Sequence, residues 1–212
     1  YVTFMLPGLL AGIMQQVIFL AMALVFARDF EDGYFSELVQ ESKWSFYHIG
    51  LKSTPFLLMI PVMWLLVSAF IPYFNIEASI YNFPMLLLVV LLTLASMCIG
   101  MLFSIAIPSQ LKATELLMVI STPAFVLSGF TWPTMAIPHA ITTIAQFIPL
   151  TQFLSGFRKI AFYGGDVASI RPEINMLLLI IVVASSAMML LLQFKIVAAR
   201  KKLNIGLEET EV

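Results

Sequence analysis

The segment from Thr3 to Ala27 carries no charged side chain and is long enough to cross a bilayer as a helix. About 20 apolar residues in a helix span the roughly 30 Å of hydrocarbon in a bilayer. Similar segments recur along the chain, and 61% of the 212 residues are hydrophobic while 11% are charged. A water-soluble domain of this size has too little interior to cover so much apolar surface. We therefore expect an integral membrane protein.

Backbone groups in lipid must form their hydrogen bonds within the protein, which favours helices. A barrel would need strands of alternating polarity, and the chain has no such pattern. The predicted fold class is therefore all-α: one transmembrane domain, residues 1–212, built as a polytopic helical bundle. About five spans are expected, over Thr3–Ala27, Thr54–Tyr73, Phe83–Ile107, Ala113–Leu127 and Ile174–Val197.

Residues 28–53 form a charged loop between the first two spans, with five acidic and three basic side chains. Apolar residues recur in it at helical spacing, which predicts one or two short amphipathic helices, and Gly33 marks a break before them. Such helices either lie on the inner lipid surface or bind a partner protein. A helix on a lipid surface is normally rich in Lys and Arg, so the acidic excess favours a protein partner.

Residues 128–172 lie where the chain is apolar but repeatedly interrupted. The run from Leu116 to Phe157 has no charged residue, yet Gly129, Pro133, Pro138 and Pro149 break it. Each proline removes a helical hydrogen bond. Two full spans are one interpretation; we prefer one span followed by a re-entrant outer hairpin of two half-helices.

Basic residues favour the cytoplasmic side of a membrane, and their distribution predicts the orientation. With the 28–53 loop, the 108–112 turn and the 198–212 tail inside, eight basic residues lie inside and Arg158, Lys159 and Arg171 lie outside. If the hairpin is counted as a full extra span, seven basic residues lie inside and four outside, and the tail moves outside. We expect a multi-pass protein of the plasma or inner membrane, with the N-terminus outside. Because the chain starts at Tyr1, next to a span, and an odd number of spans starts outside, we also expect a first helix upstream.

Three segments resemble a known family. They are Arg28–Gly33, then Leu127-Ser128-Gly129-Phe130-Thr131-Trp132-Pro133, then Ile148-Pro149-Leu150-Thr151-Gln152-Phe153-Leu154 with Arg158 and Gly164-Gly165 beyond it. Together they resemble the permease subunit of type-2 ATP-binding-cassette exporters, and the resemblance covers nearly the whole chain.

The resemblance implies two paired permeases, alike or different, driven by two cytoplasmic ATPase subunits. It implies an extracellular domain upstream of Tyr1 as well. ATP and Mg would be bound by those ATPases, and this chain would bind no cofactor. Export by alternating access of an amphipathic or apolar substrate (drug, lipid or glycan-like) is implied. The residues implied are, for coupling to the ATPase, Arg28, Glu31, Gly33 and Glu37; for the substrate path, Gln15, Gln16, Ser121 and Ser128; for the outer gate, Gly129, Phe130, Trp132, Pro133, Pro149 and Arg158.

Simpler roles stay open for several of these residues. Gln15 and Gln16 are also suited to an interhelical hydrogen bond, worth about 0.6 kcal/mol in lipid. Ser128 and Gly129 are also suited to a helix stop, and Arg158 to a cap at the outer interface.

Other classes of function have little support in the sequence. A phosphate-binding GxxxxGK[ST] loop is absent, since Gly164-Gly165 precedes Asp166, so nucleotide would bind another chain. The net charge of −1 argues against a nucleic-acid partner. Two histidines and the single Cys98 give no metal-ligand cluster. We expect no enzymatic activity from this chain itself; the alternative function is a non-transporting membrane scaffold or assembly subunit.

Overall fold

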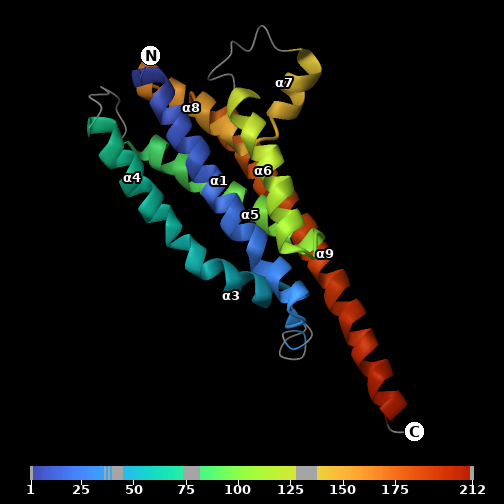
Figure 1. Ribbon diagram of the computed structural model, residues 1–212. Coiled ribbons are helices and arrows are strands. Elements are labelled where there is room, and N and C mark those ends of the chain that lie inside the picture. Colours follow the sequence, from blue (N-terminus) through green and yellow to red (C-terminus); the bar gives the residue numbers. More distant parts are fainter. Residues whose placement is uncertain are drawn as a thin grey trace.

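The computed structural model describes residues 2–35, 37, 39, 45–73, 82–127 and 138–210, and every regular element in these ranges is a helix. The prediction of an all-α bundle is therefore confirmed (Figure 1). The helices are α1 (Val2–Glu31), α3 (Ser45–Leu57), α4 (Met59–Tyr73), α5 (Phe83–Ala106), α6 (Gln110–Leu127), α7 (His139–Ala145), α8 (Pro149–Tyr163) and α9 (Arg171–Thr210).

Helix α5 lies at the centre of the bundle, in contact with α1, α4, α6, α8 and α9. Small residues let its neighbours approach closely. A Cβ atom on Gly100 would lie 2.6 Å from Cβ of Met22 on α1, and one on Gly156 of α8 would lie 2.6 Å from Cδ1 of Leu88. Helix interfaces in membranes favour such small residues, because lipid gives no hydrophobic drive for association and close packing replaces it.

The bounds of α5 agree with the predicted span to within one residue. Asn82 precedes the helix in an extended conformation and Pro84 occupies its first turn, where a missing N–H costs nothing. The helix ends at Ala106, and Ile107 is extended because Pro108 follows it.

The second predicted span, 54–73, falls on α3 and α4, and α3 begins earlier, at Ser45, inside the loop where the sequence predicts short amphipathic helices. The helix is interrupted at Leu58 before α4 begins. Pro61 explains the interruption, because it has no N–H for the carbonyl of Leu57 and its ring crowds that carbonyl. Lys52 of α3 pairs with the Asp29 carboxylate of α1.

Helices α1 and α9 extend beyond the predicted spans. Helix α1 continues past Ala27 to Glu31, and α9 continues past Val197 to Thr210. Residues 198–205 contain no Gly or Pro, and Ala, Arg and Lys are good helix formers. Most of the segment predicted as a 198–212 tail is therefore helix.

Two short helices occupy the described part of the predicted hairpin. Helix α7 has 7 residues and α8 has 15, each fewer than a full span requires. Pro149 starts α8, and Gly164 ends it with a φ of 64°, a left-handed conformation that glycine adopts without strain. Re-entry of this hairpin into the membrane stays a prediction.

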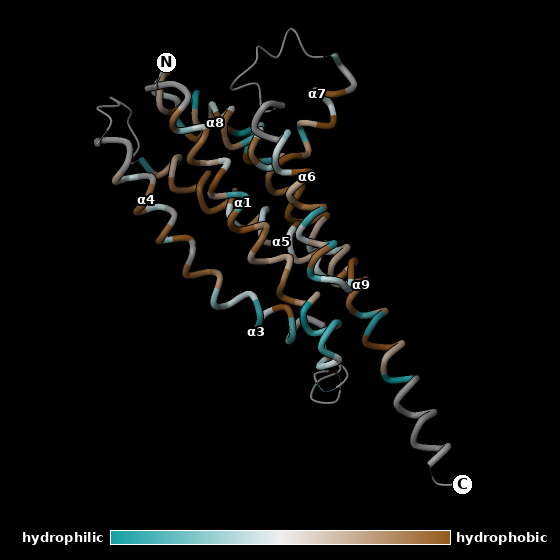
Figure 2. Tube along the Cα trace, viewed as in Figure 1, coloured by the Kyte–Doolittle hydropathy of each residue, from teal (hydrophilic) through white to brown (hydrophobic). Residues whose placement is uncertain are grey.

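Four helical segments in the described residues are long and apolar enough to cross a membrane: Leu6–Glu31, Tyr47–Leu66, Phe83–Ala106 and Arg171–Lys201. Helix α6, with 18 residues, corresponds to the fourth predicted span, 113–127, but is not among these four segments. Figure 2 shows apolar residues along the middle of the helices and polar residues where α1 ends and α3 begins. Large apolar side chains are exposed on the outside of the bundle, as lipid contact requires: Leu65, Leu111, Val119, Val182, Leu190 and Phe194.

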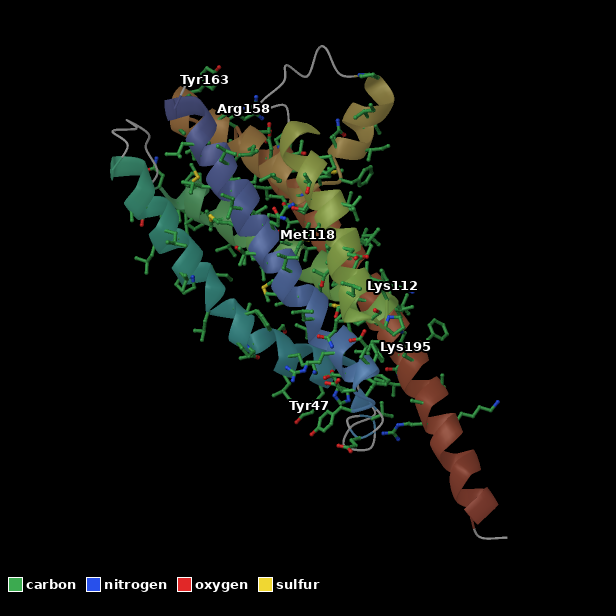
Figure 3. The ribbon with its side chains drawn as sticks, in the orientation of Figure 1. Tyr47, Lys112, Met118, Arg158, Tyr163 and Lys195 are labelled. Atoms are coloured by element: carbon green, nitrogen blue, oxygen red, sulfur yellow. The ribbon has the colours of Figure 1, made fainter. Side chains whose placement is uncertain are left out.

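The bundle has two distinct ends. Tyr47 and Lys195 lie at one of them, together with the last turn of α1, and we call this the charged end (Figure 3). Arg158 and Tyr163 lie at the other, with the N-terminus of α1 and with α7, and we call this the hairpin end. The described parts of the 28–53 loop and the turn before α6 therefore share one end, as the charge distribution predicts.

Candidate functional site

A carboxylate of α1 binds the start of α6 at the charged end. The backbone N–H of Gln110 donates to Oε1 of Glu31 at 3.0 Å, and the side-chain amide of Gln110 donates to Oε2 at 2.6 Å. Gln110 is the first residue of α6, where backbone N–H groups lack helical partners and the helix dipole favours an anion. Glu31 therefore joins the end of one helix to the start of another, 79 residues away.

A second link joins α1 to α3. The Lys52 ammonium forms an ion pair with Asp29, donates to the carbonyl of Val25 at 3.2 Å, and lies 5.3 Å from the ring centroid of Phe26. Beside this link, α1 and α3 enclose an open groove of about 640 Å³ with charged residues at its mouth and apolar walls. Its lining includes Leu24, Arg28, Leu51, Pro55 and Phe56.

Helix α9 supplies two cations to the same end. Lys195 donates to the carbonyl of Ile105, near the C-terminus of α5, and lies 4.1 Å from the ring centroid of Phe30. A cation is favoured there by the dipole of α5. Arg200 donates to the carbonyl of Val39 at 2.6 Å, so α9 also contacts the loop that follows α1. The sequence predicted these basic residues only as a signal of orientation.

The other predicted coupling residues are exposed at the surface of the charged end. Arg28 pairs with Asp32 at 3.4 Å, one turn along the helix, and both side chains are largely in solvent. Gly33 has a φ of 74°, a conformation that residues with a Cβ rarely adopt. Glu37 is exposed, and its backbone N–H donates to the carbonyl of Tyr34 at 3.1 Å. Exposed acids and bases on a tight turn suit contact with a protein surface.

The predicted path residues lie inside the bundle. Gln15 is 1% exposed, and neither atom of its amide has a hydrogen-bond partner among the described residues. Gln16 is half-buried, and Ser121 on α6 is 6% exposed. Helices α1 and α6 are in direct contact, as the predicted path requires. Ser128 lies outside the described residues.

Ser104 is a buried polar residue that the sequence analysis missed. It lies on α5, its side chain is 0% exposed, and its hydroxyl bonds the backbone of α1 rather than its own helix. The sequence holds no signal for this role, because Thr93 and Ser96 on the same helix are equally buried and bond only their own helix.

At the hairpin end, α8 and α9 are joined by a buried carboxylate. Lys159 pairs with Glu173 at 2.7 Å, and the Ser155 hydroxyl donates to the same carboxylate at 2.8 Å. Of the predicted gate residues, Pro149 is buried at the start of α8 and Arg158 is half-buried on the same helix. The others (Gly129, Phe130, Trp132 and Pro133) lie outside the described residues.

Within the described ranges, no group of three or more His, Cys, Asp or Glu side chains is placed to hold a metal ion. Several ionisable side chains instead pair with one another or with backbone carbonyls at the two ends of the bundle, among them Asp29, Lys52, Lys159, Glu173 and Lys195. This distribution suits a protein whose middle lies in lipid.

Comparison with known proteins identifies the family. The family model described as ABC-2 type transporter matches residues 1–162, which include α1 and most of α8. No curated protein and no solved structure matches the chain. Proteins of this family are the membrane subunits of transporters whose ATPase is a different component, consistent with a chain that is not itself an enzyme. The chain belongs to the ABC-2 type transporter family and is a multi-pass membrane permease component of an ABC transporter.

Proposed function

We propose that this permease exports an amphipathic or apolar substrate from the cytoplasm. In this proposal four residues at and after the end of α1 receive the movement of a cytoplasmic ATPase: Arg28, Glu31, Gly33 and Glu37. The ATPase binds ATP and Mg; two permeases, alike or different, pair to enclose the path. The charged end then faces the cytoplasm and the hairpin end faces outward. Failure to bind any ATPase would favour the non-transporting scaffold instead.

The observation that supports this proposal best is the pair of hydrogen bonds from Gln110 to Glu31. A push on the turn after α1 moves Glu31, and Glu31 is bonded to the first residue of α6. Movement at the charged end therefore reaches both helices that carry the proposed path residues Gln15, Gln16 and Ser121. An ATPase acting there would change the relation of α1 to α6 without touching the membrane interior.

The absence of charged side chains from the first span supports an apolar or amphipathic substrate. The buried Gln15 amide has no hydrogen-bond partner within the described part of the chain, so it suits a polar group that passes close to α1. The proposed outer gate consists of Gly129, Phe130, Trp132, Pro133, Pro149 and Arg158, with Ser128 at the end of the path. Of these, the described residues Pro149 and Arg158 both lie on α8.

The test is to co-purify the chain with candidate ATPase subunits and to measure ATP hydrolysis and substrate transport in proteoliposomes. Glu31→Ala should lower transport per ATP hydrolysed by roughly five- to tenfold, the lower part of the usual range for coupling between sites. Gly33→Ala should have the same effect, because a residue with a Cβ is strained at the φ of 74°. A steric clash is not the cause, since a Cβ at this position has open space around it.

Asp32→Ala is the matched control. It removes a carboxylate from the same turn, but one that pairs only locally with Arg28. Transport per ATP should stay close to the wild-type value. Equal coupling in Glu31→Ala and Asp32→Ala would remove the proposed role of Glu31, and the absence of any associated ATPase would remove the transport proposal itself.

A further inference from the structure

The Ser104 hydroxyl contacts three backbone groups of α1. It accepts hydrogen bonds from the N–H of Phe26 at 2.8 Å and of Ala27 at 2.9 Å, and it donates to the carbonyl of Ala23 at 2.7 Å. A hydroxyl has one donor and two acceptor lone pairs, so all its capacity is used on one turn of a neighbouring helix.

The contacted groups belong to the hydrogen-bond ladder of α1. In an α-helix, the N–H of Ala27 donates to the carbonyl of Ala23. Ser104 lies within hydrogen-bond distance of both groups, so a side chain of α5 bridges the donor and acceptor of a helical bond. Side chains that enter the ladder in this way are an established cause of helix bends.

Two neighbouring residues show that this contact is specific. Thr93 and Ser96 are equally buried on α5, and their hydroxyls donate to the carbonyls of Val89 and Leu92 in their own helix. Ser104 alone among these three bonds α1. Gly100, one turn before it, lets the two helices come close enough for the contact.

The position of the contact gives it a consequence for coupling. The turn 23–27 lies immediately before the residues that link α1 to other helices at the charged end, Asp29 and Glu31. Any change of the bend at Ser104 therefore moves both links relative to the membrane part of α1.

We propose that Ser104 is a positioning residue: its hydroxyl makes the turn 23–27 of α1 a hinge and sets the direction of the coupling turn Arg28–Gly33. The role in coupling rests on the proposed function, whereas the hinge itself does not. Without the hydroxyl, the N–H of Ala27 and the carbonyl of Ala23 have only each other as partners, the direction of α1 changes at this turn, and the coupling turn is displaced.

The hinge is tested by a distance measurement in lipid nanodiscs without any ATPase. Spin labels go on Tyr34→Cys, beyond the hinge, and Tyr163→Cys, at the hairpin end, in a Cys98→Ser background; both tyrosines are exposed. A change in bend of about 20° over an arm of roughly 12 Å moves the first label by about 4 Å. Ser104→Ala should show this shift, and Ser96→Ala, the matched buried serine, should not.

A shape-matched pair removes the effect of side-chain size. Ser104→Thr keeps the hydroxyl and Ser104→Val replaces it by a methyl group of similar volume, so the valine variant should shift the distance further from the wild-type value than the threonine variant. Equal distances in the pair would overturn the hinge, as would an unchanged distance in Ser104→Ala. If Ser104→Ala does not fold, the comparison of Ser104→Thr with Ser104→Val tests the hinge by itself.

The role in coupling is measured with the ATPase present. Ser104→Ala should lower transport per ATP about fivefold, as Glu31→Ala does, and Ser96→Ala should not. A shifted distance without any associated ATPase would leave the hinge standing and remove the proposed function. An unchanged distance, with Glu31→Ala still uncoupled, would remove the hinge and leave the proposed function.

Discussion

Gly100 and Ser104 lie one turn apart on α5, and both face α1. The glycine provides room for Met22, and the serine bonds the backbone of Ala23, Phe26 and Ala27. The approach of the two helices therefore depends on a missing side chain and on a hydroxyl. Small and weakly polar residues recur along α5, so nothing in the sequence marks Gly100 or Ser104 as a contact with α1.

Gly100→Ala should destabilise the protein by about 1–3 kcal/mol, the usual cost of overpacking a tight interface. The added Cβ meets Cβ of Met22, which is fixed to the backbone and cannot rotate away. Thermal unfolding in nanodiscs measures the loss.

Gly50→Ala is the control for that substitution, because Gly50 is also helical and has open space where a Cβ would lie. Alanine is the better helix former, so this variant should match or exceed wild-type stability, by up to about 1 kcal/mol. Equal stability of the two variants would contradict the close contact between α1 and α5.

At the scale of elements, α8 and α9 are joined by a charged group that is almost fully buried. Glu173 is 5% exposed, forms an ion pair with Lys159 and accepts a hydrogen bond from the Ser155 hydroxyl. Breaking a buried pair from one side leaves a charge without compensation, which costs more than the pair contributes.

Lys159→Met should therefore lower stability by about 1–3 kcal/mol, because Glu173 then loses its cation and keeps only neutral hydrogen-bond donors such as the Ser155 hydroxyl. The double variant Lys159→Met/Glu173→Gln should recover part of the loss, since a neutral amide still accepts from Ser155. Arg28→Gln, which breaks an exposed pair, should change stability by less than about 1 kcal/mol. Thermal unfolding of the four proteins is the measurement, and equal losses in Lys159→Met and Arg28→Gln would contradict the role of burial.

The bounds of elements were predictable where prolines determine them. Asn82, Pro84 and Pro108 fix both ends of α5, and the prediction was nearly correct. The continuity of α3 into the second span was missed, because Lys52 suggested a boundary, although lysine forms helices well and this one pairs with Asp29 of α1. The end of α9 was missed because charged residues suggest a tail, while they also form good helices.

The candidate site, too, was only partly predictable from the sequence. The charged loop and its acidic residues were visible in the sequence as a polar segment between spans. Their connections were not, because Glu31 and Gln110 are 79 residues apart, and Arg200 and Val39 are 161 apart. A sequence shows which residues are polar, and only the packing of helices shows which of them meet.

At the scale of the whole molecule, the two ends of the bundle should face opposite sides of the membrane. In a Cys98→Ser background, a cysteine at Tyr163 should react with an impermeant thiol reagent added to intact cells. A cysteine at Tyr47 should react only after the cells are opened. Both side chains are exposed, at 83% and 52%, so burial does not limit either reaction.

The labelling pattern shows whether the proposed orientation or the two-ended arrangement is wrong. Labelling at Tyr47 alone in intact cells would reverse the proposed orientation and keep the two-ended arrangement. Labelling at both positions in intact cells would contradict the arrangement itself.

Helix α9 has 40 residues, which gives it a length of about 60 Å, twice the roughly 30 Å of hydrocarbon in a bilayer. Its contacts through Lys195 and Arg200 lie where it leaves the bundle, so the turns beyond them project as a rod. A sideways force on the part of α9 beyond Arg200 would turn the helix about these two contacts. Through Lys195 that rotation would reach Ile105 of α5, the residue next to Ser104.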